Sequence, residues 1–140
     1  GVFRGQVWTP PMDWLYESPE ELTARCGAGN RWREGLSRKH RSSIFPAEYF
    51  RLVSQRADIL VTHEAPSSHP HGFEAIDELA RSLGVTKAFH GHHHDHLDYS
   101  RDRIRLGFEA FGVGFCGVSC MNGSCIQPGK FDNEPVGRFR

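Results

Sequence analysis

The segment from residue 58 to residue 90 constrains the fold more than any other part of this sequence. It begins with DILVTH, an apolar and β-branched run typical of a buried strand, and it ends with VTKAFH, a second short strand. Between them, GFEAIDELARSLG places apolar residues at helical spacing and ends on Gly84, a typical helix cap. A connection of this length forms a right-handed crossover, so we expect a parallel βαβ unit at about 58–90.

Histidines gather where this unit ends. Eight of the nine histidines lie between His63 and His96, and HGHHHDH at residues 90–96 contains five of them. Neighbouring parallel strands open at the same edge of a sheet, and open α/β sheets bind their ligands at that edge. We therefore expect His63 to meet the residues that follow His90, although almost thirty positions separate them in the chain.

The spacing of these histidines favours a metal site. Side chains alternate in extended chain, so His92 and His94 should point to one side and His93 to the other. Neutral imidazole binds Zn, Mn or Fe through a ring nitrogen, and we predict His63, His92 and His94 as metal ligands. Nearby carboxylates would accept hydrogen bonds from the other ring nitrogens, and the candidates are Glu64, Asp95 and Asp98. The alternative is a solvated polar loop, which we favour for His69, His71 and His93.

The N-terminal part of the chain predicts a strand and two helices. VFRGQVW, close to the start, is typical of a strand. Ser18 is a good N-cap and Glu21 completes a capping box, so a short helix should begin here and stop near Gly27. A second helix is expected from about Pro46 to Gln55.

A basic stretch follows the first predicted helix. Guanidinium groups match phosphate oxygens, so Arg38 and Arg41 are candidate substrate-binding residues and Trp32 could stack on a base. A solvated loop is the alternative, and we favour it. The charged residues of this loop, residues 28–43, are Arg31, Arg33, Glu34, Arg38, Lys39 and Arg41.

Composition narrows the class of protein. A chain of 140 residues is long enough for one domain, and its formal net charge of zero argues against a nucleic-acid binder held by bulk charge. No apolar run is long enough for a transmembrane helix, and the first residues do not resemble a signal peptide. We expect the four cysteines to be free thiols in a reducing cytoplasm. Metal ligation and a disulfide are the alternatives. The cysteines are Cys26, Cys116, Cys120 and Cys125.

ILVTHEAP and FHGHHHDH together resemble the last two signature blocks of the calcineurin-like metallophosphoesterases. The resemblance covers about residues 58–130, and the match falls on His63, Gly91, His92 and His94. It implies that His63 and His92 share one metal ion and that His94 binds another. It also implies the C-terminal part of a four-layer αββα sandwich, in which antiparallel strands follow the βαβ unit. RIRLGFEAFGVGF alternates in part, which suits such an antiparallel strand or hairpin.

Three earlier blocks of that family, D-x-H, G-D-x-x-D and G-N-H-D/E, are missing from this sequence. In the family they supply a bridging aspartate, an asparagine and a histidine that protonates the leaving group. The family fold would place them upstream of Gly1. We therefore expect residues 1–140 to form one partial domain that associates with an N-terminal half, with itself, or with neither.

The resemblance implies hydrolysis of phosphomonoesters or phosphodiesters by two divalent ions, Mn, Fe or Zn. Since the carboxylate ligands of the family are missing, we expect this chain alone to hold at most one ion and to show little turnover. An inactive metal-binding or interaction domain is the alternative, and an α/β domain whose histidines bind nothing is a third. We expect a cytoplasmic protein without a membrane partner, and nucleic acids stay among the candidate substrates.

Overall fold

The computed structural model describes residues 16–33, 35–40 and 43–132. The chain divides into two compact units, Gly1–Gln55 and Arg56–Arg140. The single domain expected over residues 1–140 remains a prediction. The strand expected in VFRGQVW lies outside the described residues.

The first unit contains two short helices. Helix α1 (Pro19–Arg25) begins after Ser18, whose hydroxyl accepts a hydrogen bond from the N–H of Glu21, as predicted. The Glu21 carboxylate accepts from the N–H of Glu17 at 2.8 Å, one residue before the partner that a capping box requires. Helix α2 (Pro46–Val53) confirms the second predicted helix. Among the described residues of this unit, the buried apolar side chains include Leu22, Phe45 and Tyr49.

The basic stretch between these helices contains two single 3-10 turns, η1 (Ala28–Asn30) and η2 (Arg38–His40). The Arg38 guanidinium lies over the Trp32 ring, with its central carbon 3.6 Å from the ring centroid. That position is occupied by a cation, so the indole offers less surface to a base than the sequence suggests. Arg41 lies outside the described residues.

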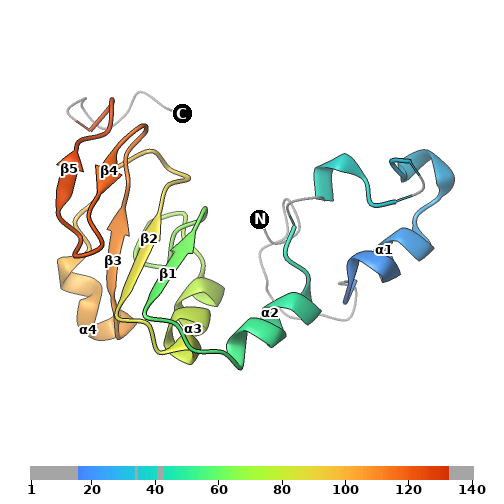
Figure 1. Cartoon of the computed structure of the whole chain (residues 1–140), viewed down its shortest axis with the longest axis horizontal. Coiled ribbons are helices and arrows are strands. Elements are labelled where there is room, and N and C mark those ends of the chain that lie inside the picture. The colour runs from blue at the N-terminus through green and yellow to red at the C-terminus, as the bar shows by residue number, and fades with distance from the viewer. Residues whose placement is uncertain (1–15, 34, 41–42, 133–140) are drawn as a thin grey trace. The chain divides into compact units, whose positions relative to one another are not determined.

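A parallel three-stranded sheet forms the centre of the second unit (Figure 1). Its strands are β1 (Ile59–Thr62), β2 (Lys87–His90) and β3 (Glu109–Gly112), in that order. Helix α3 (Glu74–Leu83) connects β1 to β2 and confirms the predicted βαβ unit. Gly84 ends this helix in the left-handed conformation, with φ at 72°, as its predicted role requires.

The segment after β2 differs from the sequence prediction. RIRLGFEAFGVGF is predicted to be antiparallel, yet β3 pairs with β2 in parallel. The turn η3 (Ser100–Asp102) and helix α4 (Arg103–Leu106) precede β3 and form a second crossover, which returns the chain in the same direction. Within the described residues, strands β4 (Val118–Ser119) and β5 (Cys125–Gln127) pair antiparallel. The chain is therefore mixed α/β, and the αββα sandwich remains a prediction.

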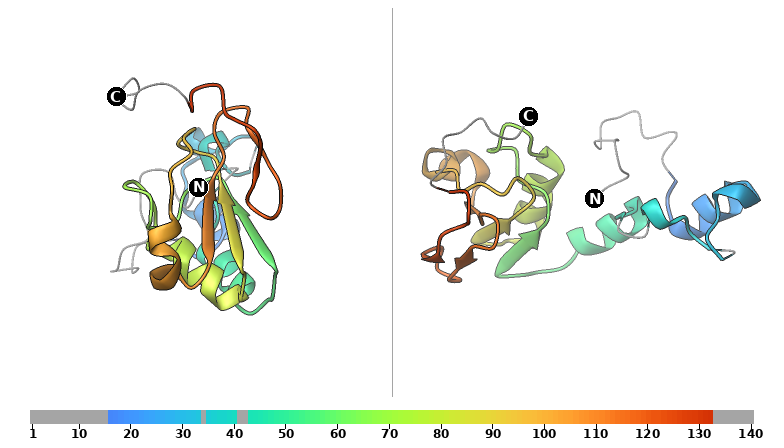
Figure 2. Two further views of the ribbon diagram at one scale, coloured as in Figure 1. Left: turned by 90° about the vertical axis from the view of Figure 1, so that its left-hand side faces the viewer. Right: turned by 90° about the horizontal axis from the view of Figure 1, so that it is seen from above.

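The two faces of the sheet are covered differently. Helices α3 and α4 lie on one face and the β4–β5 hairpin lies on the other (Figures 1 and 2). Ala88 of the central strand β2 and Ala110 of β3 are buried neighbours. Phe89 and Phe111 stack with ring centroids 5.0 Å apart, and the hairpin turn packs on the Phe111 ring. Val61 of the edge strand is 75% exposed, so the prediction that β1 is buried is wrong at this position.

A buried carboxylate fastens the loop after β1 to helix α3. Asp77 is only 2% exposed, and it accepts hydrogen bonds from the N–H of Ser67 at 2.9 Å and from its hydroxyl at 2.6 Å. Arg105 of α4 donates to the same hydroxyl at 2.8 Å, and Arg81 lies 3.6 Å from the carboxylate. These contacts neutralise the buried charge and hold the loop in place.

Replacing Asp77 with Asn should lower the free energy of unfolding by about 2–3 kcal/mol, because a buried network of hydrogen bonds loses its charged acceptor. Urea denaturation monitored by circular dichroism measures this change. Asp102→Asn is the matched control, since Asp102 accepts from the same Arg105 at 2.9 Å but on the surface, where such pairs contribute less than about 1 kcal/mol. Equal losses in the two variants would contradict the role given to Asp77.

Candidate metal centre

The backbone pairing of the parallel sheet continues beyond β1. The carbonyl of His63 accepts hydrogen bonds from the N–H of His92 at 2.8 Å and from that of Gly91 at 3.3 Å. The residues that follow the two strands are thereby held together at the carboxyl edge of the sheet. The structure brings His63 and His92 together, as parallel strands predict.

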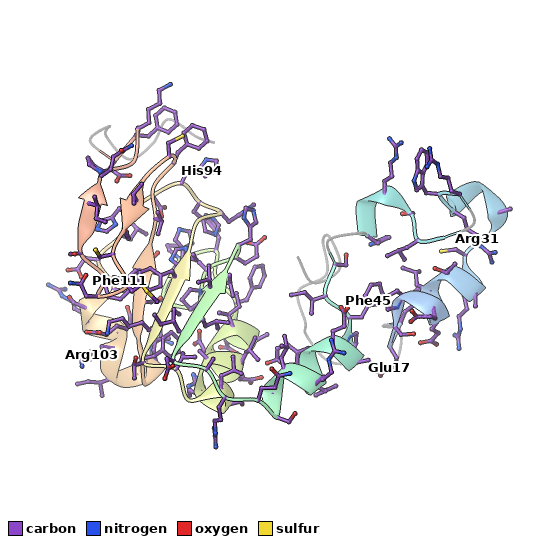
Figure 3. All side chains as sticks on the ribbon, in the orientation of Figure 1. Glu17, Arg31, Phe45, His94, Arg103 and Phe111 are labelled. Carbon is purple, nitrogen blue, oxygen red and sulfur yellow. The ribbon has the colours of Figure 1, made fainter. Side chains whose placement is uncertain are left out.

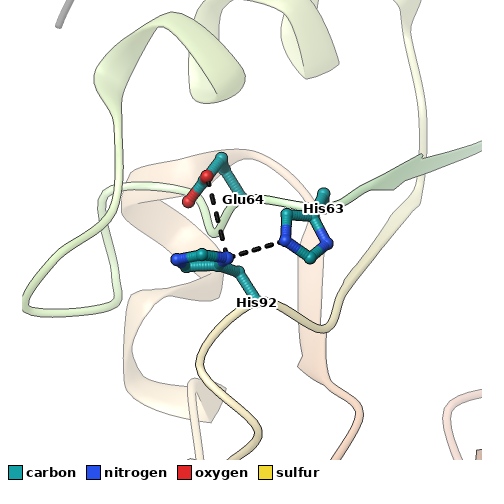
Figure 4. Close-up of side chains that lie close together, drawn as sticks. All are labelled: His63, Glu64 and His92. Carbon is teal, nitrogen blue, oxygen red and sulfur yellow. Dashed lines mark hydrogen bonds and ion pairs between the residues drawn. The ribbon is translucent and has the colours of Figure 1, made fainter. Parts of the chain in front are cut away.

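Three side chains at this edge can hold one metal ion (Figure 4). His63, Glu64 and His92 each offer one ligand atom, and these atoms lie within 4.8 Å of one another. Nδ1 of His92 lies 2.7 Å from Nε2 of His63 and 3.9 Å from Oε1 of Glu64. Two imidazole nitrogens and a carboxylate oxygen form a donor set that zinc uses in catalytic sites. We call these three residues the metal group.

The short contact between the two imidazoles includes a proton, because one nitrogen must donate and the other must accept. Around a tetrahedral ion with bonds of about 2.0–2.1 Å, two donor atoms lie about 3.3 Å apart. A small opening of the His63–His92 contact is therefore enough to admit an ion, and the shared proton must leave when the ion binds. The residues present fit a single divalent ion.

His94 lies outside the metal group. Residues 91–94 form a turn, in which the N–H of His94 donates to the carbonyl of Gly91 at 3.3 Å and its φ is 58°. The His94 ring contacts the Phe115 ring, with centroids 5.0 Å apart, beyond the carboxyl ends of the strands (Figure 3). Alternation in extended chain does not apply to a turn, which is why His92 and His94 separate. The role of His94 as a ligand of a second ion remains a prediction.

The three carboxylates expected to support the ligands have different positions. Glu64 belongs to the metal group itself, where its oxygen can bind an ion directly. Asp95 pairs with His69, at 3.2 Å. Asp98 accepts from the N–H of Ser100 at 2.8 Å, and this hydrogen bond lowers the pKa of the Asp98 carboxyl. The candidate Arg38 lies in the first unit, over Trp32.

A second group of polar residues, missed by the sequence prediction, lies beside the metal group. The prediction of a solvated loop is wrong for His69, which is 5% exposed. Its ring stacks on that of His93, with centroids 3.7 Å apart and planes at 11°. Its Nδ1 accepts the N–H of His71, so Nε2 carries the proton that is donated to Asp95. We call this group the inner cluster, and its members are His69, His90, His93, Asp95 and Tyr99.

The surroundings of His90 in the inner cluster keep its imidazole neutral. His90 is 3% exposed, and neither of its ring nitrogens has a hydrogen-bond partner within the described residues. Burial, reinforced by the neighbouring His69, lowers the pKa of His90 to about 4. Burial also lowers the pKa of His93 and raises that of the Tyr99 hydroxyl. His90 therefore carries no charge at neutral pH.

The stability of the fold should decrease as the pH falls from about 6.5 to about 4. Unfolded His90 takes up a proton near the ordinary imidazole pKa of about 6.5, whereas folded His90 does so only near a pKa of about 4. The unfolded state binds more protons between these values, which corresponds to a loss of about 3 kcal/mol. Urea denaturation in EDTA at a series of pH values measures this loss. His90→Gln should flatten the pH dependence, and an unchanged slope would contradict the assignment.

Comparison with known proteins finds a relative of this chain. A protein of Haemophilus influenzae, described as an uncharacterized protein, is 40% identical to this chain over 134 residues. The match covers 96% of this chain and 58% of the relative, so the chain spans little more than half of the relative's length. No family model and no solved structure matches the chain. None of the helices within the described residues has the length and apolar character needed to cross a membrane.

Proposed function

We propose that His63, Glu64 and His92 bind a divalent ion at which a phosphoester is hydrolysed, and that they form the C-terminal part of a two-metal centre. One observation carries the proposal: segments almost thirty residues apart bring two imidazole nitrogens to within 2.7 Å, next to a carboxylate. The resemblance of the surrounding sequence blocks to metallophosphoesterases supports the choice of reaction. The identity of the phosphoester stays open.

The metal group suits a catalytic ion rather than a purely structural one. A divalent ion in such a site supplies Lewis acidity to a phosphoryl oxygen and a water of lowered pKa. His63 and His92 contribute neutral donors, and Glu64 offsets only one charge of the ion. Three protein ligands leave one position of a tetrahedral ion open, as in catalytic zinc sites. Both histidines are exposed, which gives a phosphoester access from solvent.

A metal-binding domain without hydrolytic activity is the second candidate. Among the described residues, the metal group is the one set of three or more potential ligands that lie within 4.8 Å of one another. A second ion therefore has no ready set of ligands in this part of the chain. That the chain alone holds at most one ion remains a prediction.

Metal titration tests the binding half of the proposal. Isothermal calorimetry with Zn²⁺ and Mn²⁺ on the metal-free chain should give at most one equivalent. His63→Ala and His92→Ala should each weaken binding roughly 100-fold or more, because each removes one donor of three. His71→Ala is the matched control, since it removes an exposed histidine of the same unit outside the metal group. Equal affinities of the three variants would exclude the metal group as the site.

Hydrolysis of a chromogenic phosphodiester with Mn²⁺ separates the two candidates. We expect little turnover from the 140-residue chain and metal-dependent turnover from the Haemophilus influenzae relative, whose additional length could complete the centre. A relative that binds Mn²⁺ and hydrolyses neither phosphomonoesters nor phosphodiesters would favour the domain without activity. Many turnovers per second from the 140-residue chain would contradict the division of the centre.

A further inference from the structure

We propose that His69 is a positioning residue that locks together the two loops carrying the metal group. Residues 63–73 form one loop and supply His63 and Glu64, and residues 91–99 form the other and supply His92. The inference rests on the proposed function only in treating these three residues as a metal site. His69 itself does not belong to the metal group.

His69 links the two loops through a partly buried hydrogen bond. Its Nε2 donates to Oδ2 of Asp95 at 3.2 Å, and the His69 side chain is 4% exposed. Within the described residues, the other side-chain contacts between these loops that involve a hydrogen bond or an ion pair are those of the metal group itself. The His69–Asp95 bond therefore adds a side-chain link to the backbone hydrogen bonds at His63, and it does so without a bound ion.

The position of His69 is fixed from its own loop as well. Its backbone N–H donates to the carbonyl of Pro66 at 3.0 Å, and its carbonyl accepts from the N–H of Gly72 at 2.9 Å. Nδ1 accepts the N–H of His71 at 3.0 Å, which sets the orientation of the ring. A Cβ at Gly72 would collide with the Pro66 carbonyl, so the tight loop requires glycine there.

A row of ring contacts leads from His69 to the metal group. His69 stacks on His93, and His93 meets His92 edge to face, with centroids 4.9 Å apart. His92 in turn meets His63 at a centroid distance of 4.6 Å. Without His69, the His93 ring loses the surface against which it packs, and His92 becomes free to turn away from His63.

The fold itself has other supports, so the effect of His69 should be local. The Asp77 carboxylate holds Ser67, and the N–H of Phe73 donates to the carbonyl of Ala65 at 3.0 Å. These contacts close the loop and attach it to α3 without His69. Variants at position 69 should therefore keep the sheet and the helices while the metal group loses its geometry.

Metal affinity and geometry test this inference directly. His69→Ala and Asp95→Ala should bind Zn²⁺ roughly 10- to 100-fold more weakly than the wild-type chain, the range seen when residues supporting metal ligands are removed. The absorption spectrum of bound Co²⁺ should change in both variants. His69→Gln keeps an N–H that can reach Asp95 and should recover part of the affinity. His69→Phe keeps only the ring packing and should not recover the part that depends on the bond to Asp95. Glu78→Ala, at an exposed position of α3 outside both groups, is the control and should leave affinity and spectrum unchanged.

Amide hydrogen exchange without metal provides the second measurement. In His69→Ala and Asp95→Ala, the amides of Gly91 and His92 should exchange faster by roughly tenfold or more, while those of the central strand β2 keep their protection. If the wild-type chain binds Zn²⁺, an affinity of His69→Ala equal to that of Glu78→Ala overturns the positioning role. If the wild-type chain binds no metal, the proposed function fails, and exchange then decides the role of His69: unchanged rates at Gly91 and His92 overturn it.

Discussion

Two hydrogen bonds to the carbonyl of His63, from Gly91 at 3.3 Å and from His92 at 2.8 Å, determine the arrangement on which the candidate site depends. They extend the parallel register, in which Thr62 lies opposite His90, by one more residue at the carboxyl edge. A register shift of one residue would send the side chains that follow β2 to the other face of the sheet. The metal group is therefore a consequence of strand pairing rather than of the number of histidines.

Burial determines which of the clustered imidazoles can carry charge. A cation bound by His63, Glu64 and His92 would be repelled if the neighbouring imidazoles of the inner cluster were protonated. Burial lowers the pKa of both His90 and His93, which weakens this repulsion. The hydrogen bonds from Ser67 to Asp77 of α3 hold the same region from the helix side. Rigid support of this kind favours a preorganised ligand set.

The sequence predicts the parts of this structure that follow from periodicity and from strand direction. The βαβ unit, the cap at Gly84 and the meeting of His63 with His92 are of this kind. It does not predict the parallel β3, because partial alternation reports a strand but not its direction. It also misplaces His94, because the turn at residues 91–94 depends on backbone contacts that the spacing of histidines does not reveal. The burial of His69 arises from its packing against His93 and its bond to Asp95. An acidic residue directly after a histidine run is too common a signal to predict this burial.

Crystals of the chain soaked with one equivalent of Zn²⁺ and measured on both sides of the zinc absorption edge test the central claim most directly. We expect one anomalous peak, about 2.0–2.2 Å from a ring nitrogen of His63, a ring nitrogen of His92 and an oxygen of Glu64. A peak bound by His94 without His63 and His92, or no peak near the carboxyl edge of the sheet, would contradict it.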